Sequence, residues 1–108
     1  MKSKYSVFMN KTKKSFREKI SDFIELSYSD YSDKILLADG FDEAFIGIGD
    51  NAQGNPVAVY SIEKCLDILE KQFEDEEDPI GDAFDFFEFN VKGSYVGEFT
   101  PMFVNTLS

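Results

Sequence analysis

The chain repeats its apolar residues at the helical spacing of three and four positions in three stretches. The first, residues 15–26, opens with Ser15 and Glu18 in the capping-box form S-x-x-E, which predicts a helix N-terminus there. The second, residues 62–73, follows Ser61, whose hydroxyl is suited to cap a helix. Both stretches are predicted to be amphipathic helices that bury one side.

The third helical pattern begins at Asp78 and Pro79, a helix cap followed by proline at the first helical position. It ends at Lys92 and Gly93, where glycine favours a helix stop. Its apolar face is formed by Ile80, Ala83, Phe84, Phe87 and Val91. We expect Phe87 to lie in the core and to face a sheet.

Short apolar runs bounded by turn residues predict the strands. Three runs lie between the first two helices, at residues 34–38, 44–49 and 57–60. A fourth strand is expected at residues 95–99, with residues 102–104 continuing along a sheet edge. The order α-β-β-β-α-α-β is typical of an α+β fold. We therefore predict a single domain with a small, mostly antiparallel sheet and helices packed on one face.

Size and composition favour one folded domain without a membrane segment. A length of 108 residues matches a single domain, and 43% hydrophobic residues are sufficient for a core. No apolar run approaches the ~20 residues that a membrane-spanning helix needs, and the N-terminal lysines precede no signal-peptide stretch. Cys65, the only cysteine, is expected to be a small buried apolar residue. The absence of a disulfide partner suits a reducing compartment, so we expect a cytoplasmic protein.

The net charge of −10 is distributed unevenly. Residues 1–20 hold seven Lys/Arg and one acid, a charge of +6, whereas the remaining 88 residues hold four lysines and twenty acids, a charge of −16. We interpret residues 1–14 as a basic arm and residues 15–108 as an acidic domain. An acidic domain repels nucleic acid and membranes and favours basic partners.

Acidic residues of the second and third helices, and of the link between them, lie off the apolar stripes. Such a surface is either a solvated helix face or a mimic of nucleic-acid phosphate, since acids three and four positions apart on a helix lie about 5–6 Å apart. On the second interpretation its partner is a basic or nucleic-acid-binding protein. The candidate partner-binding residues are Glu63, Asp67, Glu70, Glu74, Asp75, Glu76, Glu77, Asp78, Asp82 and Asp85.

The basic arm and the start of the first helix suggest a different function. Five cations there can contact nucleic acid, which would make the chain a nucleic-acid-associated accessory protein. They can also fold back on the acidic domain, contact another copy in a homodimer, or remain solvated. Direct nucleic-acid binding is less favoured than protein binding because the rest of the chain is acidic. These cations are Lys11, Lys13, Lys14, Arg17 and Lys19.

Motifs of common enzymes are missing from the sequence. The chain has no histidine, which removes the usual general base, and it has no Walker A or G-x-G-x-x-G motif. Four carboxylates near two turns can gather around a hard cation, but no window has the EF-hand pattern. We therefore expect a non-enzymatic protein without cofactor or metal, with a carboxylate-based enzyme or metal-binding protein as a third possibility. The four carboxylates are Asp39, Asp42, Glu43 and Asp50.

Three segments carry a resemblance to other proteins: LLADGFDEAFIGIG (36–49), PVAVYSIEKCLDILEK (56–71) and FFEFNVKGSYVGEFTPMFV (86–104). They resemble a group of small uncharacterised proteins encoded by tailed bacteriophages and prophages. The basic arm, the first helix and the segment EDEEDPIGD depart from that pattern. The resemblance implies a role in the host cytoplasm during infection, and it assigns no activity or site. With the acidic surface, it favours a phage protein that binds another protein, as a counter-defence or host-takeover inhibitor.

Overall fold

A computed structural model of the protein describes residues 15–107. The chain divides between Ser32 and Asp33 into two compact units, which are described separately. In the first unit, helix α2 (Phe16–Ser27) is followed by the short 3-10 helix η1 (Ser29–Tyr31). The Ser15 hydroxyl accepts a hydrogen bond from the Glu18 amide (3.1 Å), and the Glu18 carboxylate accepts one from the Ser15 amide (2.9 Å). The predicted capping box is confirmed.

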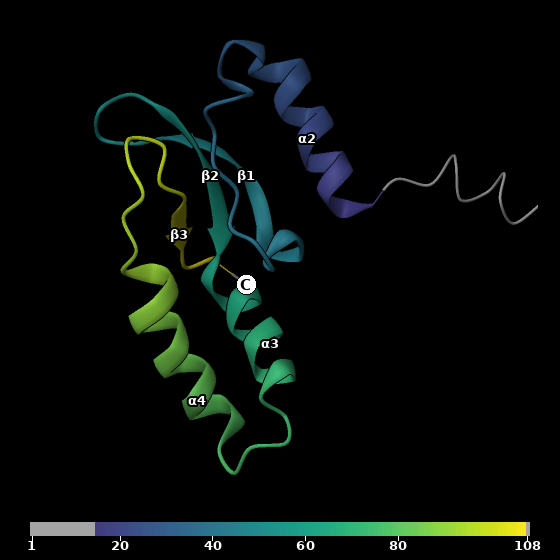
Figure 1. Ribbon diagram of the computed structural model, residues 1–108, viewed down its shortest axis with the longest axis vertical. Helices are drawn as coiled ribbons and strands as arrows, with labels where there is room; N and C mark the ends of the chain where they lie inside the picture. The colour runs from purple at the N-terminus through teal and green to yellow at the C-terminus, as the bar shows by residue number, and fades with distance from the viewer. Residues whose placement is uncertain (1–14, 108) are drawn as a thin grey trace, which may run out of the picture. The chain divides into compact units, whose positions relative to one another are not determined.

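The second unit contains a three-stranded sheet in the order β1-β2-β3 (Figure 1). Strand β1 (Phe45–Asp50) follows the 3-10 helix η2 (Asp42–Ala44) and forms an antiparallel hairpin with β2 (Pro56–Ser61). Strand β3 (Met102–Val104) pairs with β2 in parallel. The α+β fold class and the approximate order of elements are confirmed, but the sheet has mixed strand directions and three strands instead of four.

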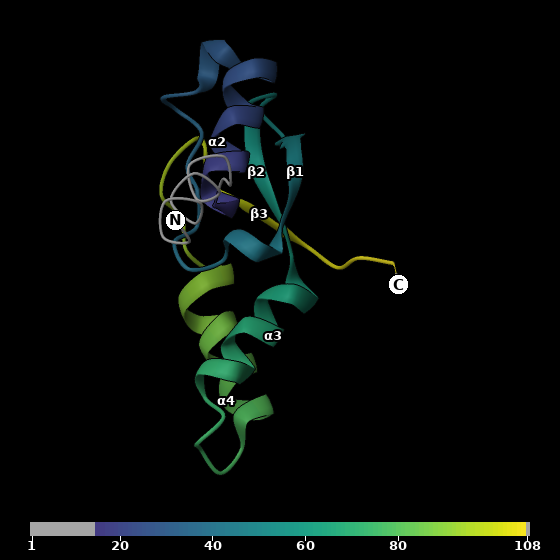
Figure 2. The same cartoon turned by 90° about the vertical axis from the view of Figure 1, so that its right-hand side faces the viewer.

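Two helices connect β2 to β3. Helix α3 (Ile62–Gln72) begins directly after β2, and helix α4 (Pro79–Phe86) continues into a π-helical segment, η3 (Phe87–Lys92). The predicted caps form, since Ser61 accepts from the Lys64 amide and Asp78 from the Gly81 amide. In both views the α3–α4 hairpin extends beyond one end of β2 (Figures 1 and 2).

Aromatic rings join this hairpin to the sheet. Phe87 of η3 is fully buried and meets Phe103 of β3 edge to face, with ring centroids 5.4 Å apart. Phe103 also stacks on Tyr60 of β2 at 5.5 Å, and Tyr60 contacts Phe45 of β1 at 5.8 Å. The prediction that Phe87 faces the sheet is confirmed. Ile80 and Phe84, expected on the same buried face, are exposed.

The strand predicted at residues 34–38 is wrong. These residues have no regular secondary structure, although Ile35 is buried as the apolar run implied. The amide of Ala38 donates to the phenolic oxygen of Tyr60 at 2.8 Å, so a side chain takes the hydrogen bond that a neighbouring strand would have made. The run therefore contributes a buried side chain to the core without joining the sheet.

The strand predicted at residues 95–99 is also wrong. The amide of Val96 donates to the Thr100 hydroxyl (2.9 Å), which itself donates to the Gly97 carbonyl (2.6 Å). Gly97 has a φ of 120°, a conformation that glycine adopts readily and other residues avoid. The segment is a loop held by hydrogen bonds between its own residues, and only residues 102–104 pair with the sheet edge.

Candidate functional site

The α3–α4 hairpin carries ten acidic residues that we call the acidic hairpin surface. They are Glu63, Asp67, Glu70, Glu74, Asp75, Glu76, Glu77, Asp78, Asp82 and Asp85. Helix α3 buries Cys65 and Leu69, and its acids lie off that buried stripe. Nine of the ten are exposed and Glu70 is half-buried. The structure therefore gathers the predicted residues on one hairpin, while their role in binding stays a prediction.

The turn between the two helices has the densest charge. It runs from Glu74 to Asp78, and all five of its residues are acidic and exposed. The amide of Glu76 donates to the Phe73 carbonyl (2.9 Å), and the Phe73 ring packs against Phe86 of α4 with centroids 5.8 Å apart. This aromatic contact holds the two helices together below the turn and fixes the turn's position on the hairpin.

Two of the ten acids also have a structural role. Asp78 caps α4, and a Cβ atom at Gly81 would lie too close to the present position of its carboxylate, so a larger residue there would require the Asp78 side chain to shift. Glu63 accepts a hydrogen bond from the Thr106 hydroxyl at 2.7 Å. An eleventh acid that the sequence did not assign to this surface, Glu43 of η2, shares a shallow depression with Asp67 and Lys64.

The charge of this surface is not neutralised by neighbouring cations. The second unit holds four lysines and seventeen acids, a net charge of −13. Within residues 15–107, none of the ten acids forms an ion pair with a lysine or arginine. A pair between Lys92 and Glu88 (3.5 Å) lies on η3, outside the surface. The acidic hairpin surface therefore presents its charge to solvent.

Three of the cations proposed to bind nucleic acid, Lys11, Lys13 and Lys14, lie outside the described residues. Arg17 and Lys19 lie in the first part of α2, where Arg17 is half-buried and Lys19 is exposed. The proposed nucleic-acid role of the five cations stays a prediction.

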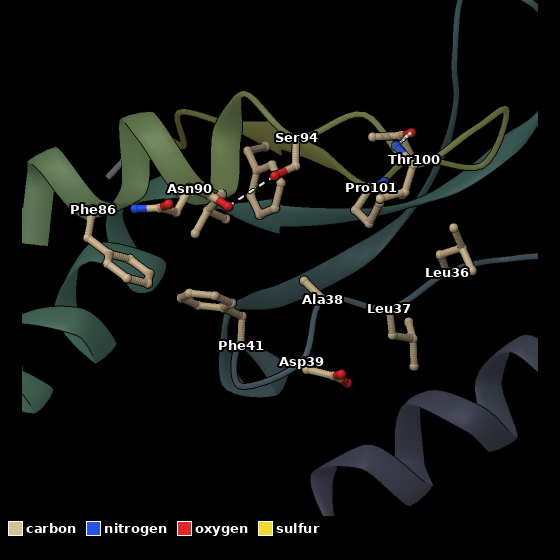
Figure 3. A pocket seen from close by; sticks show the side chains of 13 residues that line it. Leu36, Leu37, Ala38, Asp39, Phe41, Phe86, Asn90, Ser94, Thr100 and Pro101 are labelled. Atoms are coloured by element: carbon tan, nitrogen blue, oxygen red, sulfur yellow. Dashed lines mark hydrogen bonds between the residues drawn. The ribbon is translucent and has the colours of Figure 1, made fainter.

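Sequence reasoning missed an apolar groove of about 560 Å³ in the second unit. Residues 36–41 form one wall, and the end of α4, η3 and residues 94–101 form the other, as Figure 3 shows. Phe103 of β3 also lines the groove, and its polar lining includes Asn90, Ser94 and Thr100. The strands expected at 34–38 and 95–99 would have belonged to the sheet, so no pattern in these segments indicates that they border a cavity.

Neither a metal-binding carboxylate cluster nor a reactive thiol is found among residues 15–107. Among residues 15–107, no three His, Cys, Asp or Glu residues lie close enough to hold a metal ion, so Asp39, Asp42, Glu43 and Asp50 form no such cluster. Cys65 is fully buried, as expected, and burial raises the pKa of its thiol from 9.0 to about 12. A thiol with this pKa is protonated at neutral pH, which makes it a poor nucleophile.

Comparisons with known proteins assign no function to the chain, so the proposals below are based on the acidic hairpin surface and the groove. No known protein family matches the chain, and neither the curated proteins nor the solved structures include a match. Among the described residues, no helix has both the length and the apolar character needed to span a membrane.

Proposed function

We propose that this protein acts by binding a basic protein partner through the acidic hairpin surface. The observation that carries the proposal is the set of ten acids on one hairpin, none of which is paired with a cation among residues 15–107. Exposed like charges at this density repel one another, which opposes folding of the compact chain. A basic partner relieves that repulsion and gains long-range electrostatic attraction.

The spacing of the acids suits the partner's nucleic-acid site. Glu63, Asp67 and Glu70 of α3 recur three and four positions apart, so the Cβ atoms of neighbouring acids lie about 5–6 Å apart. Each strand of B-DNA carries about one charge per 3.4 Å of the helix axis, so a protein site that binds phosphates also attracts acids spaced a few ångströms apart. The proposed partner is a nucleic-acid-binding protein whose phosphate site the hairpin occupies.

A role during phage infection fits this mode of action. The sequence resemblance to small phage proteins implies expression inside a bacterial host, where nucleic-acid-binding defence and replication proteins are accessible targets. Blocking such a target requires binding alone and no catalysis. We therefore propose a counter-defence or host-takeover inhibitor acting in the host cytoplasm.

The experiment is an affinity capture from bacterial lysate with the full chain as bait, followed by displacement with duplex DNA. We expect captured basic proteins to be released by DNA and by raised salt, because exposed charges are screened within about 10 Å at 0.1 M ionic strength. A bait with Glu70, Glu74, Asp75, Glu76 and Glu77 changed to Gln or Asn should lose them.

The matched control removes five negative charges elsewhere. Its acids, all exposed, are Glu25, Asp30, Asp33, Asp50 and Glu98, changed in the same way. This bait should capture the same proteins as the wild type. Equal loss with both baits would show that net charge alone drives capture, and retention by the hairpin variant would contradict the proposal.

A further inference from the structure

The run Ile35–Leu37 has unused backbone hydrogen-bonding groups. No other residue in the described part of the chain makes a hydrogen bond to the backbone of Ile35, Leu36 or Leu37. The next residue, Ala38, is anchored, since its amide donates to Tyr60 and its carbonyl accepts from Phe41. The run is therefore anchored at Ala38, whereas the backbone N–H and C=O groups of residues 35–37 have no hydrogen-bond partner among the described residues.

This run also has the properties of a strand. Its sequence, KILLA, predicts a strand, and Figure 3 shows the Leu36 and Leu37 side chains on opposite sides of the chain, as in an extended backbone. Unpaired backbone groups of an extended segment are a template for a strand from another chain. A strand of a partner protein can make the backbone hydrogen bonds that the sheet of this chain does not make to this run.

The groove lies along the same run. Leu36 and Leu37 line it together with Phe41 and, on the opposite wall, Val91 and Val96. Leu36 and Val96 are substantially exposed at their positions along the groove. In strand addition, backbone pairing provides affinity and pockets for alternate side chains provide specificity. The groove provides an apolar pocket beside the free backbone.

The far wall of the groove belongs to an unusual helix. Asn90 and Val91 lie in the π-helical segment η3, and the Ser94 hydroxyl donates to the Asn90 carbonyl at 3.0 Å (Figure 3). π-Helical turns are rare and occur frequently at functional sites. This wall is also fixed to the core, since Phe87 in the same segment is fully buried.

Charge selects among the occupants that can fill such a groove. The unit that contains it has a net charge of −13, and its single charged lining residue is Asp39. A second copy of the chain, at −10, is repelled, whereas a basic segment is attracted. An extended segment that alternates apolar and basic residues meets both the apolar lining and the surrounding negative charge.

We propose that the groove is a docking site for an extended, basic segment of a partner protein, which pairs its backbone with residues 35–37 and places alternate apolar side chains in the groove. This site is separate from the acidic hairpin surface. It stands or falls independently of the function proposed for that surface.

The probe is a displayed library of random 12-residue peptides, selected on the full chain. Enriched peptides should alternate apolar residues with Lys or Arg. In hydrogen exchange, alternate amides within residues 35–37 should exchange quickly in the free protein and at least about ten-fold more slowly with an enriched peptide bound, because successive N–H groups of a strand point to opposite sides and an added strand protects those that face it. Methylating alternate backbone nitrogens of the peptide should abolish binding.

A matched pair of substitutions locates the binding. Val96→Arg places a positive charge in the groove at a residue that is 60% exposed, and it should weaken binding by about ten-fold or more. Phe89→Arg makes the same kind of change at a residue that is 81% exposed and outside the groove, and it should leave binding unaltered. Circular dichroism spectra that match the wild type should show that both variants fold.

Several outcomes overturn the proposal. They are no peptide enrichment above selection without protein, bound peptides that leave the amides of residues 35–37 unprotected, and equal binding by the Val96→Arg variant. Binding that disappears in the five-acid hairpin variant but survives Val96→Arg would assign the peptides to the acidic hairpin surface. A change of oligomeric state caused by Val96→Arg would indicate that a second copy occupies the groove.

Discussion

Phe87 joins the helical hairpin to the sheet, because its fully buried ring contacts Phe103 of β3. Phe87→Ala leaves a cavity there, so we expect it to lower the free energy of unfolding by about 3–5 kcal/mol in urea denaturation. Phe89→Ala, two residues along the same segment but 81% exposed, should change it by less than about 0.5 kcal/mol. Similar losses in both variants would mean that η3 is rotated from the orientation described.

Cys65 makes stability depend on alkaline pH. Burial raises its pKa from 9.0 to about 12, so the folded state holds the thiol proton more tightly than the unfolded state does. The resulting stabilisation is complete below pH 9 and is lost as pH rises toward 12, by about 1.4 kcal/mol per unit.

Comparing the wild type with Cys65→Ala isolates this effect from the tyrosines and lysines that titrate in the same range. In urea denaturation at pH 8 and pH 10, the wild type should lose about 1.4 kcal/mol more than the variant as pH increases. In native protein at pH 7, a thiol reagent should label Cys65 only after unfolding. Rapid labelling of the folded protein would contradict its burial.

At the scale of elements, local signals predicted the helices and failed for two of the strands. Capping side chains at Ser15, Ser61 and Asp78 act within three residues, so a short sequence contains the whole interaction. A strand depends on a partner elsewhere in the chain. The KILLA run has strand-like residues, but its neighbour is the Tyr60 hydroxyl, 22 residues beyond Ala38. Propensity cannot reveal that partner.

The same distinction explains how much of the candidate sites was predictable. Helical periodicity placed the acids of α3 and α4 on the surface, because residues off an apolar stripe face solvent. The groove was not predictable, since it is made where residues 36–41 meet η3 and residues 94–101. The reversal at Gly97, with its positive φ, ended the expected fourth strand and left a loop as part of the wall.

Substitutions of Asp78 at the N-terminus of α4 distinguish the capping role of its side chain from the effect of its charge. Asp78 accepts a hydrogen bond from the Gly81 amide at 3.1 Å. Asp78→Ala removes this cap and should cost about 1 kcal/mol in thermal or urea unfolding, whereas Asp78→Asn keeps an equally good capping side chain without the charge. We expect Asp78→Asn to have nearly wild-type stability. If both variants lose the same amount, the charge and not the cap stabilises the helix.

At the scale of the whole molecule, charge repulsion opposes folding. The chain has a net charge of −10, and ten acids of the hairpin lack ion pairs within the described residues. Salt screens this repulsion, because the Debye length falls from ~30 Å at 0.01 M to ~10 Å at 0.1 M ionic strength. We therefore expect the thermal midpoint to rise over this range.

The variant with five neutralised hairpin acids tests the origin of that rise. Its midpoint should be higher than that of the wild type at low salt and should depend less on salt, because the closest repulsions are gone. The control variant with five acids neutralised elsewhere should retain more of the salt dependence. A wild-type midpoint that falls with added salt would mean that attractive charge pairs dominate.

The parallel pairing of β2 with β3 determines the order in which the molecule can fold. It brings Val59 against Met102, so the two strands meet only after the long intervening chain has been brought back. The β1–β2 hairpin and the α3–α4 hairpin need only local loops, and local contacts form fastest. We infer that the two hairpins form first and that β3 docks late, which completes the packing of aromatic rings around Phe103.

In stopped-flow denaturant jumps, Phe103→Leu should therefore mainly accelerate unfolding, whereas Leu69→Ala in α3 should mainly slow refolding. The opposite pattern would show that the sheet edge nucleates folding and that the helices assemble on it afterwards.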